Sequence, residues 1–154
     1  MYLSRLHISK FRVFDDITLY FKNGINILIG ENNSGKTAII DALRICLGCG
    51  KPDNFIYVQD GDLHVNPENP SEINTVIQFD LIFEFGDASI ERECFYDFIS
   101  QDKDNPDKQT IQLHLKFIQE NNGKKKYFKR IIWGETTKGS KYLMNLYKKS
   151  FIPI

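Results

Sequence analysis

The sequence predicts an α/β fold: a mixed β-sheet with antiparallel N-terminal strands, a glycine-bearing loop that opens a helix, and a β-hairpin. Two alternating segments stand at the start of the chain, an apolar run with a glycine-bearing loop and a helical pattern follows at residues 25–47, and alternation returns on both sides of a turn at residues 120–123. With 154 residues, 42% of them hydrophobic and 26% charged, the chain has the size and composition of one soluble globular domain.

The N-terminal strands are predicted from period-two patterns. Residues 2–14 alternate loosely between apolar and polar side chains and run into a bend at Asp15-Asp16, after which residues 17–21 alternate again. We expect these two segments to be neighbouring antiparallel strands. Residues 25–29, Ile-Asn-Ile-Leu-Ile, are rich in β-branched side chains, which is typical of a strand buried on both faces.

A helix is predicted over residues 36–47, where apolar side chains recur at helical spacing, and Gly48 stands where a C-cap glycine would. Residues 48–72 are rich in Gly, Pro, Asn and Asp, and we expect an irregular connection there. The order is therefore strand, loop, helix, connection.

The rest of the chain returns to strand patterns. Residues 77–85 form a period-two apolar stripe, residues 89–100 could form a short helix, and residues 111–133 alternate on both sides of a Glu-Asn-Asn-Gly turn, which predicts a hairpin. Residues 138–149 are expected to form a basic helix. The chain stops at Phe151-Ile152-Pro153-Ile154, an apolar run typical of the start of another strand, so we expect a longer polypeptide.

The loop between the predicted strand and helix carries the most specific motif. It reads Gly30-Glu31-Asn32-Asn33-Ser34-Gly35-Lys36-Thr37 and fits the pattern of a phosphate-binding loop at each fixed position. The glycines are expected to adopt angles closed to other residues, so that backbone N–H groups and the helix N-terminus cradle phosphates. Lys36 would place a cation on the terminal phosphates, which makes it the catalytic candidate, and Thr37 would offer its hydroxyl to Mg²⁺. The sequence therefore predicts a site for a nucleoside triphosphate, ATP first among them.

Hydrolysis requires further residues, namely a carboxylate for Mg²⁺ at the end of a second buried strand and a group that orients water. No run of four apolar residues is followed by Asp and Glu; Asp80 and Glu84 fall on the polar side of a strand pattern, and Glu135 follows an imperfect run. We therefore expect this chain alone to bind nucleotide and to turn it over slowly or not at all. A P-loop kinase or GTPase is less favoured, because those folds usually open with the strand of the loop itself.

The cysteines and the hydropathy argue against other classes of protein. Cys46 and Cys49 form a C-x-x-C pair, but no second Cys or His pair stands at metal spacing, so we expect Cys46 to fill a helix face rather than to serve redox or zinc chemistry. Neither a membrane span nor a signal peptide is visible, and three cysteines suit a reducing compartment. The cytoplasm is the expected location, with no membrane partner.

Charge is segregated along the chain although the net charge is zero. Residues 108–154 carry eleven Lys and Arg against two Asp and Glu, and residues 76–107 carry two against nine. The basic cluster of the hairpin is a candidate for contact with DNA, and the alternative is a sheet edge kept soluble by its lysines. This cluster consists of Lys124, Lys125, Lys126, Lys129 and Arg130.

The first third of the chain resembles a known family. Residues 1–47, which contain Phe11-Arg12-Val13-Phe14 and the loop, resemble the N-terminus of the ABC-type ATPases related to RecF and the structural-maintenance-of-chromosomes (SMC) proteins. Within that group, Glu31-Asn32-Asn33-Ser34 is most similar to the overcoming-lysogenization-defect (OLD) family, also catalogued as AAA-type ATPases, since RecF and SMC members usually carry Pro and Gly where this chain has Glu31 and Asn33.

The resemblance implies that residues 1–154 are the N-terminal nucleotide-binding lobe of a split, ABC-type P-loop ATPase. The second ATPase lobe and a C-terminal Toprim nuclease, both absent from this chain, would follow. Members pair head to tail as homodimers with ATP between them, and OLD proteins cleave DNA, often in defence against phage. The resemblance places Arg12 near the nucleotide, the alternative being an exposed cation at a strand end. The alternative function is a nucleotide-gated repair or clamp ATPase of the RecF or SMC type, without a nuclease.

Overall fold

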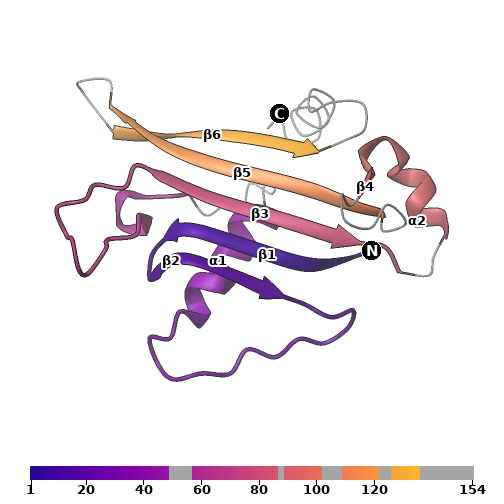
Figure 1. Ribbon diagram of the computed structural model, residues 1–154, viewed down its shortest axis with the longest axis horizontal. Helices are drawn as coiled ribbons and strands as arrows, with labels where there is room; N and C mark the ends of the chain where they lie inside the picture. Colours follow the sequence, from indigo (N-terminus) through magenta and orange to yellow (C-terminus); the bar gives the residue numbers. More distant parts are fainter. Residues whose placement is uncertain (49–56, 87–88, 102–108, 122–125, 136–154) are drawn as a thin grey trace.

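The computed structural model describes residues 1–48, 57–86, 89–101, 109–121 and 126–135. Its framework is a six-stranded sheet in the order β2-β1-β3-β5-β4, in which β6 also pairs with β5. Each strand pairing is antiparallel. Figure 1 looks onto the face of the sheet, with the strands side by side. The strands are β1 (Tyr2–Phe11), β2 (Phe14–Tyr20), β3 (Val76–Glu84), β4 (Ser100–Gln101), β5 (Gln109–Asn121) and β6 (Lys126–Glu135).

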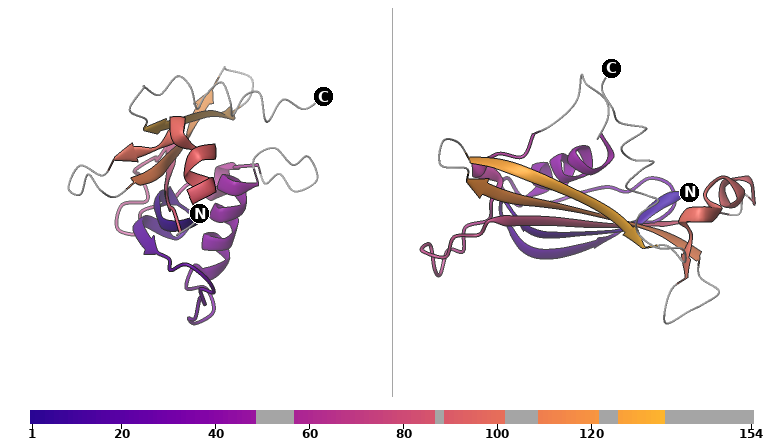
Figure 2. Two further views of the ribbon diagram at one scale, coloured as in Figure 1. Left: turned by 90° about the vertical axis from the view of Figure 1, so that its right-hand side faces the viewer. Right: turned by 90° about the horizontal axis from the view of Figure 1, so that it is seen from above.

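One helix, α1 (Lys36–Leu47), packs across one face of the sheet (Figure 2). Alternation in the strands directs every second side chain to this face, where Phe79 contacts Phe11 and Phe117 edge to face at centroid distances of 5.2 and 6.1 Å. Cys46 is fully buried on the inner face of α1, as predicted. The fully buried residues of this core include Leu6, Ile8, Phe11, Ala42, Cys46, Ile77, Phe79, Leu81 and Leu115.

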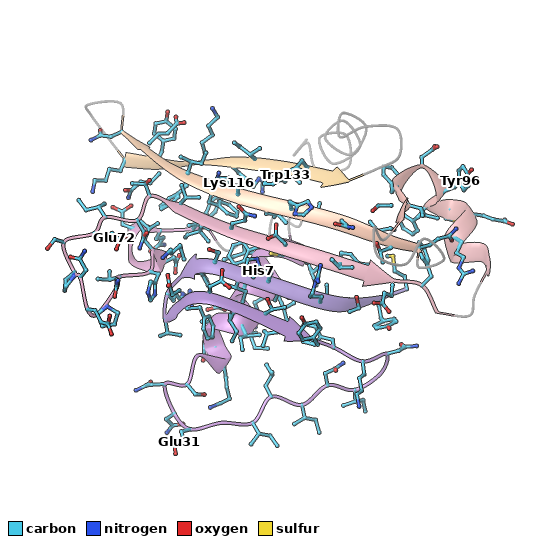
Figure 3. The ribbon with its side chains drawn as sticks, in the orientation of Figure 1. His7, Glu31, Glu72, Tyr96, Lys116 and Trp133 are labelled. Carbon is cyan, nitrogen blue, oxygen red and sulfur yellow. The ribbon has the colours of Figure 1, made fainter. Side chains whose placement is uncertain are left out.

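The opposite face of the sheet carries a row of polar side chains. His7 on β1 pairs through Nδ1 with Asp80 of β3 at 2.9 Å and through Nε2 with Asp16 of β2 at 2.9 Å. Asp80 also pairs with His114 Nδ1 of β5 at 2.5 Å, and the His114 ring stacks on Trp133 of β6 at 5.1 Å. These residues, which we call the polar row, therefore link five adjacent strands. The register pairs His7 with Asp80, Asp80 with His114 and His114 with Trp133, and Figure 3 labels two residues of this row, His7 and Trp133.

The prediction for residues 25–29 is wrong. The segment forms no strand, and the side chains of Ile25, Ile27 and Ile29 are 93, 77 and 91% exposed. The physical reason is that a strand buried on both faces needs neighbouring strands and two covering layers, and in the described residues no strand pairs with this segment. As a result, no described pairing is parallel, although the α/β class with antiparallel N-terminal strands, helix and hairpin is confirmed.

The other predicted elements are found close to their expected places. The helix begins at Lys36 and ends at Leu47, with Gly48 as its C-cap, whose N–H donates to Arg44 O at 2.8 Å. In the described part of the 48–72 connection, the regular structure is the short 3₁₀ turn η2 (Asp60–Asp62) and a bridge between Phe11 and Leu63. The predicted short helix appears as α2 (Ser89–Cys94) followed by η3 (Tyr96–Phe98).

Two predictions cannot be compared with the fold, because residues 138–149 and 151–154 lie outside the described residues. Across the part of the chain that the structure describes, no helix has the length and apolar character needed to cross a membrane.

Candidate phosphate-binding site

The glycine-bearing loop leads directly into the uncapped N-terminus of α1. Gly35 is the N-cap residue, its φ is +91°, and its carbonyl accepts the hydrogen bond of Ile39 N at 3.0 Å. No side chain caps the helix, and its first turn contains no acidic residue. Because the first N–H groups of a helix have no partner inside the helix, this end presents backbone donors and a partial positive charge to an anion.

The two glycines of the motif serve different physical needs. At Gly35 the left-handed φ favours glycine, and a Cβ there would stand 2.4 Å from Phe14 Cζ and 2.9 Å from Val13 Cγ2. At Gly30 the backbone has no such φ; a Cβ would instead lie 2.7 Å from Ser34 Oγ. The expectation of unusual angles at both glycines is therefore correct for Gly35, whereas Gly30 provides space.

Asn33 adopts the left-handed conformation, with φ at +66°. Asn is among the few residues that accept this region without large cost, and glycine is the other common choice. The loop thus turns at Asn33 and again at Gly35, while Ser34 N donates to Glu31 O at 3.3 Å. Glu31 and Asn32 are exposed on the outside of this turn, and Figure 3 shows Glu31 at the periphery of the molecule.

Lys36 folds back over its own loop. Its Nζ donates to Gly30 O at 2.7 Å and to Glu31 O at 2.6 Å. Both acceptors are neutral carbonyls, so a phosphate oxygen, which carries negative charge, would be a stronger acceptor for the same ammonium. Thr37 follows in the first turn of α1 with an exposed side chain, where its hydroxyl is accessible to a metal ion held by phosphate oxygens.

Arg12 lies in the turn between β1 and β2, against this loop. Its Nε donates to Asp62 Oδ1 at 2.7 Å and its Nη1 to Asp41 Oδ2 at 2.6 Å. Burial disfavours the charge of the guanidinium, but the hydrogen bonds to Asp62 and Asp41 outweigh it and raise the pKa of Arg12. The alternative for Arg12, an exposed cation at a strand end, does not hold, because two carboxylates from different elements engage this side chain and it is 28% exposed.

The sequence analysis missed the partners of Arg12. Asp41 lies on α1, one turn beyond the loop, and Asp62 lies on η2, where its Oδ2 also accepts Gln59 N at 2.9 Å. A carboxylate on the polar side of a motif helix would have been the only available signal for Asp41. The pairing with Asp62 spans fifty positions of sequence and has no local signature.

Asp80 and Glu84, the acidic residues of the 77–85 stripe, have partners outside the phosphate loop. Asp80 belongs to the polar row, and Tyr2 OH donates to Glu84 Oε2 at 2.9 Å. Among the residues described here, no group of three or more His, Cys, Asp and Glu is arranged to hold a metal ion. Mg²⁺ commonly binds through one or two protein ligands together with phosphate oxygens and water, so Thr37 beside an anion cradle suits it without such a group.

The basic cluster of the hairpin is separated from the loop. Lys126, Lys129 and Arg130 lie on β6, which pairs with β5, whereas the loop follows β2 at the opposite edge of the sheet (Figure 1). Lys129 Nζ is 3.7 Å from Glu120 Oε1 across the hairpin. Lys124 and Lys125 lie outside the described residues.

Two DNA repair proteins are similar in sequence to part of this chain. The DNA replication and repair protein RecF of Limosilactobacillus reuteri is 42% identical over 45 residues, which are 29% of this chain and 12% of RecF. The DNA double-strand break repair Rad50 ATPase of Thermoplasma volcanium is 40% identical over 47 residues, 30% of this chain and 5% of Rad50. The matches thus span a small part of each relative.

The fold has a solved counterpart. A structure from work on the ATP-driven dimerization and DNA-stimulated activation of SMC ATPases has a TM-score of 0.61, with 14% sequence identity over 97% of this chain and 79% of that chain. At this identity the likeness concerns the fold alone, and it agrees with the predicted sheet with antiparallel N-terminal strands, a helix and a hairpin. The family model of the AAA domain matches residues 5–152. The chain therefore belongs to the AAA domain family.

Proposed function

We propose that this chain is the nucleotide-binding lobe of an ATPase of the RecF, Rad50 and SMC type, and that it binds ATP with Mg²⁺ at residues 30–37. The observation that carries the proposal is the uncapped start of α1 behind a loop in which Gly35 takes a left-handed φ and Lys36 holds its ammonium over the loop carbonyls. A helix start with uncapped N–H groups beside a lysine that donates to neutral oxygens is suited to an anion.

Each residue of the motif has a proposed role in binding. The N–H groups of the loop and of the first turn of α1 surround the phosphates. Lys36 exchanges its two carbonyl acceptors for phosphate oxygens, and Thr37 donates an oxygen ligand to Mg²⁺, which neutralises phosphate charge when bound. Because no run of four apolar residues in the sequence is followed by the Asp and Glu that hydrolysis requires, we expect slow turnover by this chain alone.

The repair or clamp type is favoured over an OLD-type endonuclease. The OLD assignment depended on Glu31 and Asn33, and the φ of +66° at Asn33 explains why Asn can adopt the conformation that Gly would have there. The curated relatives named above are RecF and Rad50, whose names refer to DNA repair. We therefore propose a DNA-associated, homodimeric and cytoplasmic ATPase, and leave the nuclease and defence function as the second candidate.

The exposed segment at residues 25–29 supports the proposal that this lobe is completed by further polypeptide. Three isoleucine side chains that alternate along the segment are more than three-quarters exposed. Exposed alternating apolar residues with unpaired backbone groups are typical of a strand that adds to another sheet. In a split ATPase, strands of the second lobe would fill this place.

Calorimetric titration of ATP and of GTP into the wild-type chain with Mg²⁺ tests the site. We expect ATP to bind, and Lys36→Ala to weaken binding by about 100-fold or more, because a charge-assisted contact to phosphate is removed. Lys22→Ala is the matched control, since Lys22 is an exposed lysine outside the motif and should leave the affinity unchanged. Equal affinity of the wild type and Lys36→Ala would refute the site.

DNA contact by the basic cluster is tested separately. The double variant Lys129→Glu and Arg130→Glu reverses two exposed charges on β6 and should weaken the binding of labelled duplex DNA at least tenfold at low salt, with a smaller salt dependence. Fluorescence anisotropy provides the measurement. Unchanged affinity would mean that the lysines only keep the hairpin edge soluble.

A further inference from the structure

The turn that carries Arg12 is held in a costly conformation directly against the phosphate loop. Lys10 and Arg12 both have positive φ, 58° and 51°, which costs an L-residue about 1 to 2 kcal/mol each. A Cβ on Gly35 would stand 2.9 Å from Val13 Cγ2, so the turn and the loop are in van der Waals contact. Backbone strain of this kind, maintained by surrounding structure, is concentrated at functional sites.

The guanidinium is fixed from two sides but is not enclosed. Asp62 accepts a hydrogen bond from Arg12 Nε and Asp41 accepts one from Arg12 Nη1. In the described part of the chain no acceptor is hydrogen-bonded to Nη2. The side chain of Arg12 keeps 28% of its surface exposed, whereas those of Asp41 and Asp62 keep 15 and 11%. Arg44 Nη1, 3.6 Å from Asp41 Oδ1, compensates the second carboxylate. The result is an arginine of fixed orientation whose Nη2, with its two N–H groups, is available to an anion.

We propose that Asp62, together with Asp41, is a positioning residue for the nucleotide: it acts through Arg12 and fixes the guanidinium beside the phosphate loop. The inference rests on the proposed function, because it assumes that a triphosphate occupies residues 30–37. It also extends the nucleotide site to the connection after α1, because Asp62 belongs to η2 and not to the phosphate-loop motif.

Besides the carboxylate, which accepts Gln59 N, several other contacts hold the main chain around Asp62. Arg12 N donates to Asp62 O at 2.8 Å, His64 N donates to Lys10 O at 3.1 Å, and the His64 ring donates from Nδ1 to Arg12 O at 2.8 Å. Leu63 forms a bridge with Phe11. The variant Asp62→Asn, which has the same shape without the charge, is therefore expected to fold.

A double-mutant cycle measures whether Asp62 acts through Arg12. We expect Asp62→Asn to weaken ATP binding roughly tenfold, the loss that corresponds to one charge-assisted hydrogen bond. In the Arg12→Ala background the same substitution should cause no further loss, because the guanidinium that it positions is absent. Asp62→Glu should restore part of the affinity in the Arg12 background only.

The matched control is Asp80→Asn, which removes a partly buried carboxylate from the opposite face of the sheet. It should lower stability but leave the affinity for ATP unchanged, so that a general loss of structure can be recognised. Wild-type affinity in Asp62→Asn, or an equal loss with and without Arg12, would overturn the positioning role while ATP binding by the wild type still stood. Failure of the wild type to bind ATP would instead overturn the proposed function, and this inference with it.

Discussion

Removal of the Asp80 carboxylate should lower the stability of the sheet in a pH-dependent manner. Asp80 accepts hydrogen bonds from Gln78 at 3.0 and 3.1 Å and pairs with one histidine on each neighbouring strand. Burial alone would raise its pKa, but the contacts of His114, His7 and Gln78 outweigh it and lower the pKa from its ordinary 3.8 to about 2. The lowering of nearly two units corresponds to about 2 kcal/mol of folding free energy.

The stability contributed by the polar row should rise with pH at the acidic end and fall with pH above about 6.5. Because the folded pKa of Asp80 is depressed, its contribution is present above pH 3.8 and is lost as the pH falls toward 2. Burial lowers the pKa of His7, but its hydrogen bonds to Asp80 and Asp16 raise it above 6.5 overall. Its contribution is therefore present below pH 6.5 and is lost as the pH rises through the raised value. The polar row should stabilise the sheet most between about pH 4 and 6.5.

Urea denaturation of the wild type and of Asp80→Asn at several pH values between 2 and 8 provides the measurement. The difference in unfolding free energy should be about 2 kcal/mol near pH 5 and should shrink at both ends. Asp15→Asn removes an exposed carboxylate that pairs with Lys10 and is expected to change little. A difference between wild type and Asp80→Asn that is independent of pH would show that the Asp80 charge is not the source of the stabilisation.

Two further predictions concern packing. Gly35→Ala should lower the unfolding free energy by at least about 1 to 2 kcal/mol and abolish ATP binding, because alanine disfavours the left-handed φ and its Cβ would clash with the Phe14 ring. In the control variant Gly61→Ala the new Cβ meets nothing within 4 Å, so thermal melts and ATP titrations should be unchanged. Phe79→Ala should cost about 3 to 5 kcal/mol in denaturation experiments, while Ile27→Ser, at a 77% exposed position, should cost less than about 0.5; equal losses would contradict the assigned core.

Local patterns were sufficient for most of the fold. The stripe at residues 77–85 became β3, the alternation around residues 120–123 became the β5 and β6 hairpin, and the helix begins and ends at the predicted residues. In each case the periodicity reflects one buried face, which is a property of the segment itself. The segment at residues 25–29 failed for the opposite reason. Its pattern indicates burial, but burial requires partners that the described residues do not supply.

The candidate site likewise has a part that the sequence predicted and a part that it did not. The phosphate loop was evident because its chemistry depends on residues at fixed spacing within one turn. The hydrogen bonds of Arg12 with Asp41 and Asp62, and the polar row, were not evident from the sequence, because they join residues of different elements. Face assignment follows from strand parity, so His7, Asp80 and His114 could be assigned to a polar face, but their alignment depends on a register that emerges only from the assembled sheet.

The most direct test of nucleotide binding at residues 30–37 is a backbone amide NMR titration of the chain with ATP and Mg²⁺. Binding at residues 30–37 predicts that the largest shift changes occur at Gly30, Ser34, Gly35, Lys36 and Thr37, with smaller changes at the Arg12 turn and none along the polar row on the opposite face. Changes centred on the polar row, or an unchanged spectrum at millimolar ATP, would contradict it.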